Sequence, residues 1–253
     1  MRLPRRLRHG EEASLVEHLD ELRSRLVIAL VAVGIGFVVA FVFHEHLIEW
    51  LREPLPDDRE LTTLGVTEPF TTSIKVSFYA AIVLAFPVLL WQVWSFLAPA
   101  FEEHTQRIVA VFVAIATVLL AAGLAFAYFV VLPKALTFLT NFDEELYNPQ
   151  IRASYYFSFV SVMLLAIAVC FELPIFILAL VRLGVIDSAQ LRKNRRFGIV
   201  AAVALAILLP TVDPVSLLFE ALPLLVLFEA SIWLSVLMER RWRRADAELA
   251  TEL

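Results

Sequence analysis

Glutamates inside apolar stretches are the residues of this chain whose chemistry most needs an explanation. Glu172 lies near the middle of 155–183, a stretch long enough to cross a bilayer. Placing a carboxylate at that depth costs about 3 kcal/mol on insertion scales, so such an acid is expected to serve a proton, a solute or another protein. Glu220 and Glu229 share a second stretch. Nine positions separate them, which places them about 180° apart on a helix, so they cannot line one pocket together.

Charged residues ahead of the first apolar stretch form a second group. Residues 14–17 have the spacing of a capping box, which predicts a helix start, and a leucine stripe follows at helical spacing. Glu17, Glu21 and Arg25 recur four residues apart on another face. One interpretation is a surface helix stabilised by its own ion pairs. The other is a cytoplasmic acidic surface that receives a cationic ligand.

Catalytic and metal-binding motifs have little support in this sequence. His44 and His46 form an H-x-H pair beside Glu45 and Glu49, but this is not a ligand set of recognised spacing. The chain contains neither a helix-borne H-E-x-x-H nor a Walker loop nor a G-x-S-x-G elbow. We therefore predict no enzyme activity, no cofactor and no metal.

Composition indicates the elements that must position these residues. A hydrophobic content of 60% and a mean hydropathy of +0.78 exclude an ordinary soluble domain. We predict an all-α integral membrane protein with a single membrane domain over 1–253. A cytoplasmic amphipathic segment at 1–25 and a cytoplasmic tail at 238–253 flank six spans, of which the fifth and sixth are expected to be short. The predicted spans are 26–43, 75–97, 108–132, 155–183, 197–209 and 217–237.

Basic residues outside the spans predict the orientation. One side carries most of them: Arg2, Arg5, Arg6, Arg8, Arg23, Arg25, Arg107, Arg192, Lys193, Arg195, Arg196, Arg240, Arg241, Arg243 and Arg244. The opposite side has only Arg52, Arg59, Lys134 and Arg152, and its loops are acidic. The positive-inside rule then places both termini in the cytoplasm. Trp50, Trp91, Trp94 and Trp242 lie near span ends, as interfacial anchors do.

Prolines are expected to shape the spans and the longest outer loop. Pro87, Pro174 and Pro223 lie inside spans two, four and six, so bent helices and a curved, concave wall are expected. We assign structural roles to Pro54 and Pro69 in the outer loop 44–69, and to Phe70 directly after it. The single cysteine, Cys170, allows no intrachain disulfide.

Five short strings in order resemble the TatC family, the large subunit of the twin-arginine protein translocase. H-L-D-E-L-R-S-R-L at 18–26 resembles the family signature H-L-x-E-L-R-x-R-L. The other matches are W-Q-V-W-S-F-L-A-P at 91–99, F-A-Y-F at 126–129 with Pro133, F-E-L-P at 171–174 and L-F-E at 227–229. Together they cover almost the whole chain apart from its extreme ends.

The resemblance implies a receptor in the plasma membrane for folded export substrates. Their signal peptides carry paired arginines, whose guanidinium groups require carboxylate partners. By motif, the site residues are Glu21, Arg23 and Phe96. The position usual for a second glutamate falls on Thr105, whereas Glu102 and Glu103 come earlier, and Glu103 is our preferred substitute. The implied partners are twin-arginine signal peptides, TatA- and TatB-like single-span proteins, other TatC copies and membrane lipid, without nucleic acid.

The resemblance also assigns the intramembrane acids to partner contacts. It places Glu172 on a lipid-facing concave wall, where its carboxyl group would hydrogen-bond a partner's helix. It also implies partner contacts for Asp213 and Glu229. The turn at 210–213 departs from the family pattern, and a polar residue usual soon after Asp213 falls on Leu217. We expect Glu220, one turn later, to take over part of that role.

Two other classes of function remain open from the residues. The three intramembrane glutamates would suit a proton-coupled solute permease, and composition alone favours that interpretation. The lack of self-similar halves and the opposed positions of Glu220 and Glu229 count against it. An intramembrane enzyme lacks a nucleophile–base or metal set. The ordered motifs favour a translocase subunit driven by the proton-motive force.

Overall fold

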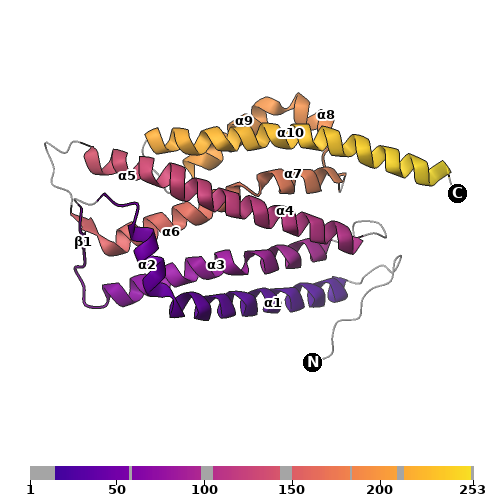
Figure 1. Ribbon diagram of the computed structural model, residues 1–253. Coiled ribbons are helices and arrows are strands. Elements are labelled where there is room, and N and C mark those ends of the chain that lie inside the picture. Colours follow the sequence, from indigo (N-terminus) through magenta and orange to yellow (C-terminus); the bar gives the residue numbers. More distant parts are fainter. Residues whose placement is uncertain are drawn as a thin grey trace. The chain divides into compact units, whose positions relative to one another are not determined.

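Helices make up almost all of the described chain (Figure 1). The computed structural model describes residues 15–56, 59–97, 105–142, 150–182, 184–209 and 214–251. These residues fall into two compact units, one over 1–51 and 63–118 and the other over 52–62 and 119–253. Two short strands, β1 (Leu61–Thr62) and β2 (Ile151–Arg152), pair in parallel within the second unit.

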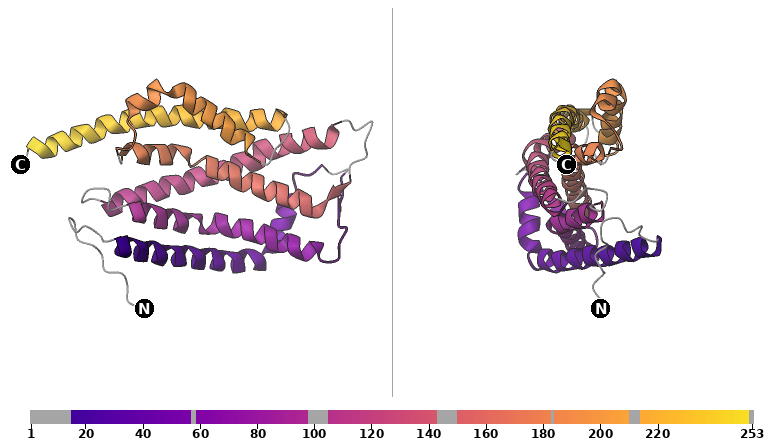
Figure 2. Two further views of the ribbon diagram at one scale, coloured as in Figure 1. Left: turned by 180° about the vertical axis from the view of Figure 1, so that it is seen from behind. Right: turned by 90° about the vertical axis from the view of Figure 1, so that its right-hand side faces the viewer.

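The first unit is built on two long helices that lie side by side (Figures 1 and 2). They are α1 (Leu15–Val42) and α3 (Glu68–Leu97), and the short α2 (His44–Arg52) follows α1. Gly36 allows the close approach, because a Cβ there would lie 2.9 Å from the carbonyl oxygen of Ala81. The buried Glu68 holds the entry to α3, accepting hydrogen bonds from the backbone N–H groups of Leu64 (2.9 Å) and Gly65 (3.2 Å). Pro69 then occupies the first helical turn, where a missing N–H is tolerated.

The second unit is organised around α10 (Pro214–Thr251), which runs beside α7, α8 and α9 (Figure 2). These three are α7 (Leu173–Arg182), α8 (Ser188–Lys193) and α9 (Arg195–Ile207). Gly198 of α9 faces the ring of Phe228 so closely that any Cβ would collide with it. Gly123 has the same role against Ala168 and Phe171, with contacts of 2.9 Å.

The third apolar stretch contains a π-helical turn. The chain passes from α4 (Thr105–Phe126) through η2 (Ala127–Val131) into α5 (Leu132–Asn141) without leaving the helix axis. The N–H of Leu132 bonds to the carbonyl of Ala127, five residues back. Pro133 comes next and has no N–H to donate. The π-helical turn therefore ends next to Pro133, where the missing N–H interrupts the α-helical hydrogen-bond pattern in any case.

The fourth apolar stretch is interrupted by two residues near its middle. Two residues, Phe171 and Glu172, separate the end of α6 (Ala153–Cys170) from the start of α7. Pro174 is the second residue of α7. The distortion expected at Pro174 takes the form of a two-residue interruption at Phe171 and Glu172, just before the proline, which has no N–H for the carbonyl of Cys170. The carbonyl of Glu172 starts α7 by accepting from Ile175 and Phe176, both at 3.1 Å. Pro87 and Pro223, by contrast, lie inside continuous helices.

In the part of the chain that the structure describes, five helical stretches are long and apolar enough to cross a membrane by length and composition: Leu19–Val42, Glu68–Phe96, Ala110–Asn141, Ala153–Arg182 and Pro214–Glu239. The expected fifth span corresponds to α9, which has 13 residues and falls short of that length. The count of six spans and the orientation of the termini therefore stay predictions. The expectation of a short last span is wrong. Its apolar part has 26 residues, and the helix-forming residues beyond it extend α10 to 38.

Candidate functional site

In the first unit, Arg25 connects the N-terminal half of α1 with the last turn of α3. Its Nε donates to Oε1 of Glu21 at 3.0 Å, and its Nη2 bonds to the same oxygen. The same Nη2 donates to the backbone carbonyl of Ser95 at 3.0 Å. Both side chains of the ion pair are about one-fifth exposed, at 22% for Glu21 and 21% for Arg25. A partly desolvated carboxylate is thereby fixed beside the last turn of α3.

The other predicted receptor residues lie close to this pair or outside the described chain. Phe96 follows Ser95 directly and is half-buried, and Arg23 is exposed on α1. Glu102 and Glu103 lie outside the described residues, and α4 begins at Thr105. The arrangement suits recognition of a guanidinium group, because a carboxylate with restricted exposure makes stronger charge-assisted hydrogen bonds than one in bulk water.

Trp94 contradicts one expectation for this end of α3. It was expected as an interfacial anchor, but it is only 1% exposed, with its ring tilted against Phe112 at a centroid distance of 5.2 Å. Trp50 and Trp91 are exposed, as anchors require. The difference lies in packing: the ring of Trp94 is covered by Phe112 of α4, whereas Trp91 is 43% exposed.

Glu172 is fully buried at the break between α6 and α7. The lipid-facing position implied by the family resemblance is therefore wrong for this side chain. Within the described residues, neither carboxylate oxygen has a hydrogen-bond partner. A buried carboxyl without partners is costly whether or not it is charged, and more so when charged. Such a group is a candidate for contact with a molecule that is absent from the isolated chain.

The two glutamates of α10 occupy different environments. Glu220 is 1% exposed, whereas the side chain of Glu229 is about one-third exposed and forms an ion pair with Arg195 at the start of α9. This agrees with their predicted placement on opposite sides of the helix. Because Glu229 is paired with Arg195 within the chain, it is less suited to a proton relay with Glu172 and Glu220. Asp213 lies outside the described residues.

Residues 52–62, in the loop that is predicted to lie outside, make contacts within the second unit that the sequence did not reveal. Tyr128, in η2, donates from its hydroxyl to Oε2 of Glu53 at 3.2 Å. Pro54 is half-buried in the turn that follows α2, and Leu55 donates back to the carbonyl of Arg52 at 2.9 Å. Farther along, β1 pairs Leu61 with Ile151 and Thr62 with Arg152. Phe70, for which the sequence predicts a structural role, is 62% exposed.

Within the described residues, five membrane-length helical stretches, three of which carry a buried carboxyl group, define a multi-span helical membrane protein. A family model described as Sec-independent protein translocase protein (TatC) matches residues 17–223. Among curated proteins, the TatC of Aquifex aeolicus is 40% identical over 233 residues, covering 90% of this chain and 96% of its own length. The TatC of Escherichia coli is 35% identical over 225 residues, covering 87% of each chain.

A solved structure agrees with these sequence matches. The crystal structure described as the twin arginine translocase receptor TatC in DDM superposes with a TM-score of 0.78 at 38% identity, covering 86% of this chain and 99% of that chain. The chain belongs to the TatC family of Sec-independent protein translocase proteins. The family resemblance predicted from the five motifs is thereby confirmed, and the role it defines is protein transport rather than catalysis.

Proposed function

We propose that this chain is the receptor of a twin-arginine translocase, binding the signal peptides of folded precursor proteins on the cytoplasmic side of the plasma membrane. The proposed orientation has both termini in the cytoplasm, following the distribution of basic residues. The solved relative described as a twin arginine translocase receptor supports this function by its likeness.

The bridge made by Arg25 is the observation that carries the proposal. It holds Oε1 of Glu21 within reach of the last turn of α3, so the carboxylate is oriented before any ligand arrives. Preorganisation of this kind raises affinity by reducing the side-chain ordering that binding requires. One arginine of the signal peptide would bind the Glu21 carboxylate, and the second would bind an acid of the following loop, for which Glu103 is our choice.

We further propose that the chain docks TatA- and TatB-like single-span subunits within the membrane and associates with further TatC copies. Glu172 and Glu220 are the acids assigned to the single-span subunits, with Asp213 beside them in sequence. Glu172 carries this assignment furthest, because its buried oxygens lack partners in the described chain. Glu229 is reassigned to holding α9 against α10 through Arg195.

Photo-crosslinking of a twin-arginine signal peptide to membranes that contain this protein tests the receptor proposal. We expect Glu21→Ala to reduce crosslinking, and Glu21→Ala with Glu103→Ala to abolish it. Asp20→Ala is the matched control, because it removes the same charge from the adjacent exposed position. A twin-lysine peptide should crosslink weakly throughout. Crosslinking that survives the double substitution would falsify the proposed site.

A further inference from the structure

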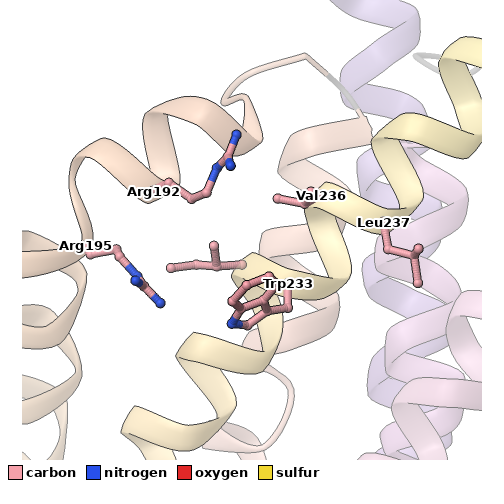
Figure 3. Close-up of a pocket in the computed structure, with 6 residues that line it drawn as sticks. Arg192, Arg195, Trp233, Val236 and Leu237 are labelled. Atoms are coloured by element: carbon pink, nitrogen blue, oxygen red, sulfur yellow. The ribbon is translucent and has the colours of Figure 1, made fainter.

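A cavity of about 300 Å³ lies within the second unit, between α8, the start of α9 and α10 (Figure 3). It is lined by Arg192, Arg195, Ile232, Trp233, Val236 and Leu237. Figure 3 shows the two arginines on the α8 and α9 side, and Trp233, Val236 and Leu237 on α10. Neither the signal-peptide site nor the partner-docking acids proposed above use this cavity.

The lining combines two chemistries. The charged groups are both guanidinium groups, and Arg195 is partly neutralised by Glu229 while Arg192 is exposed. The remaining residues are apolar or aromatic: Ile232 is buried, and Trp233 is 69% exposed. A guanidinium beside an aliphatic wall and an exposed indole is the combination that suits a membrane interface, where a ligand has one charged and one apolar end.

The arginine-bearing loop is fixed rather than free. Asp187 caps α8 by accepting from the N–H of Gln190 at 2.6 Å, and the side chain of Gln190 reaches back to the N–H of Asp187. The N–H of Ser188 donates to Oε2 of Glu239 on α10 at 3.2 Å. Because α8 is tied to α10 in this way, Arg192 keeps a defined position over the cavity.

The length of α9 supplies the reason for a lipid here. Its 13 residues span about 20 Å, less than the roughly 30 Å of hydrocarbon that a bilayer presents. Apolar side chains on it, such as Phe197 and Val200, are nevertheless 65% exposed. If α9 is the predicted fifth span, the bilayer has to thin or deform around it. Headgroups on the α8 side would then lie near Arg192 and Arg195, which stand just before and at the start of α9.

We propose that this cavity binds an anionic phospholipid, with the headgroup phosphate on Arg192 and Arg195 and an acyl chain along Ile232, Val236 and Leu237. Both charged lining residues are positive, which favours phosphatidylglycerol-type lipids over zwitterionic ones. The bound lipid covers the gap that the short α9 leaves beside α10.

Native mass spectrometry of the full chain in neutral detergent tests the proposal. The probe is phosphatidylglycerol, with phosphatidylcholine as the zwitterionic comparison. We expect Arg192→Gln to weaken phosphatidylglycerol binding about fivefold, the effect of one arginine at a charged membrane surface. Arg196→Gln is the matched control. It removes the same charge from the same loop, but its guanidinium lies over Phe197 and does not line the cavity. We expect it to leave binding unchanged.

A second variant tests the apolar half of the site without altering charge. Val236→Phe fills the cavity and is expected to reduce phosphatidylglycerol binding as well. Equal losses in the Arg192 and Arg196 variants would show general attraction to a basic loop and overturn the proposal. Equal binding of phosphatidylcholine would do the same. Displacement of the lipid by millimolar inorganic phosphate would assign the site to free anions instead.

Discussion

Arg25 is the residue on which the preorganisation of the proposed receptor site depends. Its guanidinium is shared between the Glu21 carboxylate and the Ser95 carbonyl, so it connects α1 with α3. We expect Arg25→Gln to release Glu21 and weaken signal-peptide binding about tenfold, a loss of about 1.4 kcal/mol from one charge-assisted contact. Titration of the purified protein with a fluorescent twin-arginine peptide measures the change.

Arg25→Lys separates geometry from charge at the same position. A lysine keeps the positive charge but is a single point donor and lacks the planar fork that reaches two acceptors. We expect an intermediate affinity for the lysine variant. If it binds the peptide as tightly as the unsubstituted chain, charge alone suffices and the fork that bridges Glu21 and Ser95 has no part in recognition.

Glu172 requires a different pair of substitutions, because its oxygens are buried without partners in the described chain. Glutamine keeps the shape and hydrogen-bonding capacity, whereas leucine removes the polar group. We expect Glu172→Gln to keep most export activity and Glu172→Leu to lose docking of the single-span subunits. Export of a reporter precursor and co-purification of the subunits are the two measurements. A glutamine variant as inactive as the leucine variant would show that ionisation of Glu172 is required.

At the scale of elements, the packing of α1 on α3 depends on one glycine. A Cβ at Gly36 would meet backbone atoms of Ala81, which cannot move aside as a flexible side chain does. We expect Gly36→Ala to force the helices apart and to cost about 1–3 kcal/mol of stability. Thermal unfolding in detergent measures it as a lower Tm.

Gly34 provides the matched control for this prediction. It lies in the same helix, and a Cβ there would have nothing within 4 Å. Gly34→Ala improves helix propensity by about 1 kcal/mol without a steric penalty, so an unchanged or higher Tm is expected. Similar losses in both variants would mean that glycine flexibility, rather than close packing, is what α1 requires.

The elements also show how far the sequence predicts this fold. Long apolar runs located five membrane-length helices, because the length needed to cross hydrocarbon is fixed by geometry. They did not reveal the break at Phe171 and Glu172 or the π-turn at Ala127–Val131. In both places the proline is visible in the sequence, but nothing local decides whether the chain bends, breaks or widens its turn.

In the candidate site too, the sequence predicts contacts along one helix but not contacts between helices. Spacing along one helix placed Glu21 and Arg25 on a shared face, and the ion pair between them follows from it. The bond from Arg25 to Ser95 and the ion pair between Arg195 and Glu229 join residues far apart in sequence. Periodicity carries no information about such pairs, because they depend on which helices lie side by side.

At the scale of the whole molecule, the uneven distribution of basic residues predicts an orientation that impermeant labelling can measure. Cys170 is buried and is the only cysteine, so Cys170→Ala provides a background for single-cysteine variants. Val66 lies in the proposed outer loop and is fully exposed, and Asn194 lies in the basic loop between α8 and α9. In intact cells, an impermeant maleimide should label Val66→Cys and leave Asn194→Cys unlabelled until the membrane is opened. The reverse pattern would place the basic loops outside, against the positive-inside rule, and would put Glu21 on the wrong side to meet a signal peptide before export.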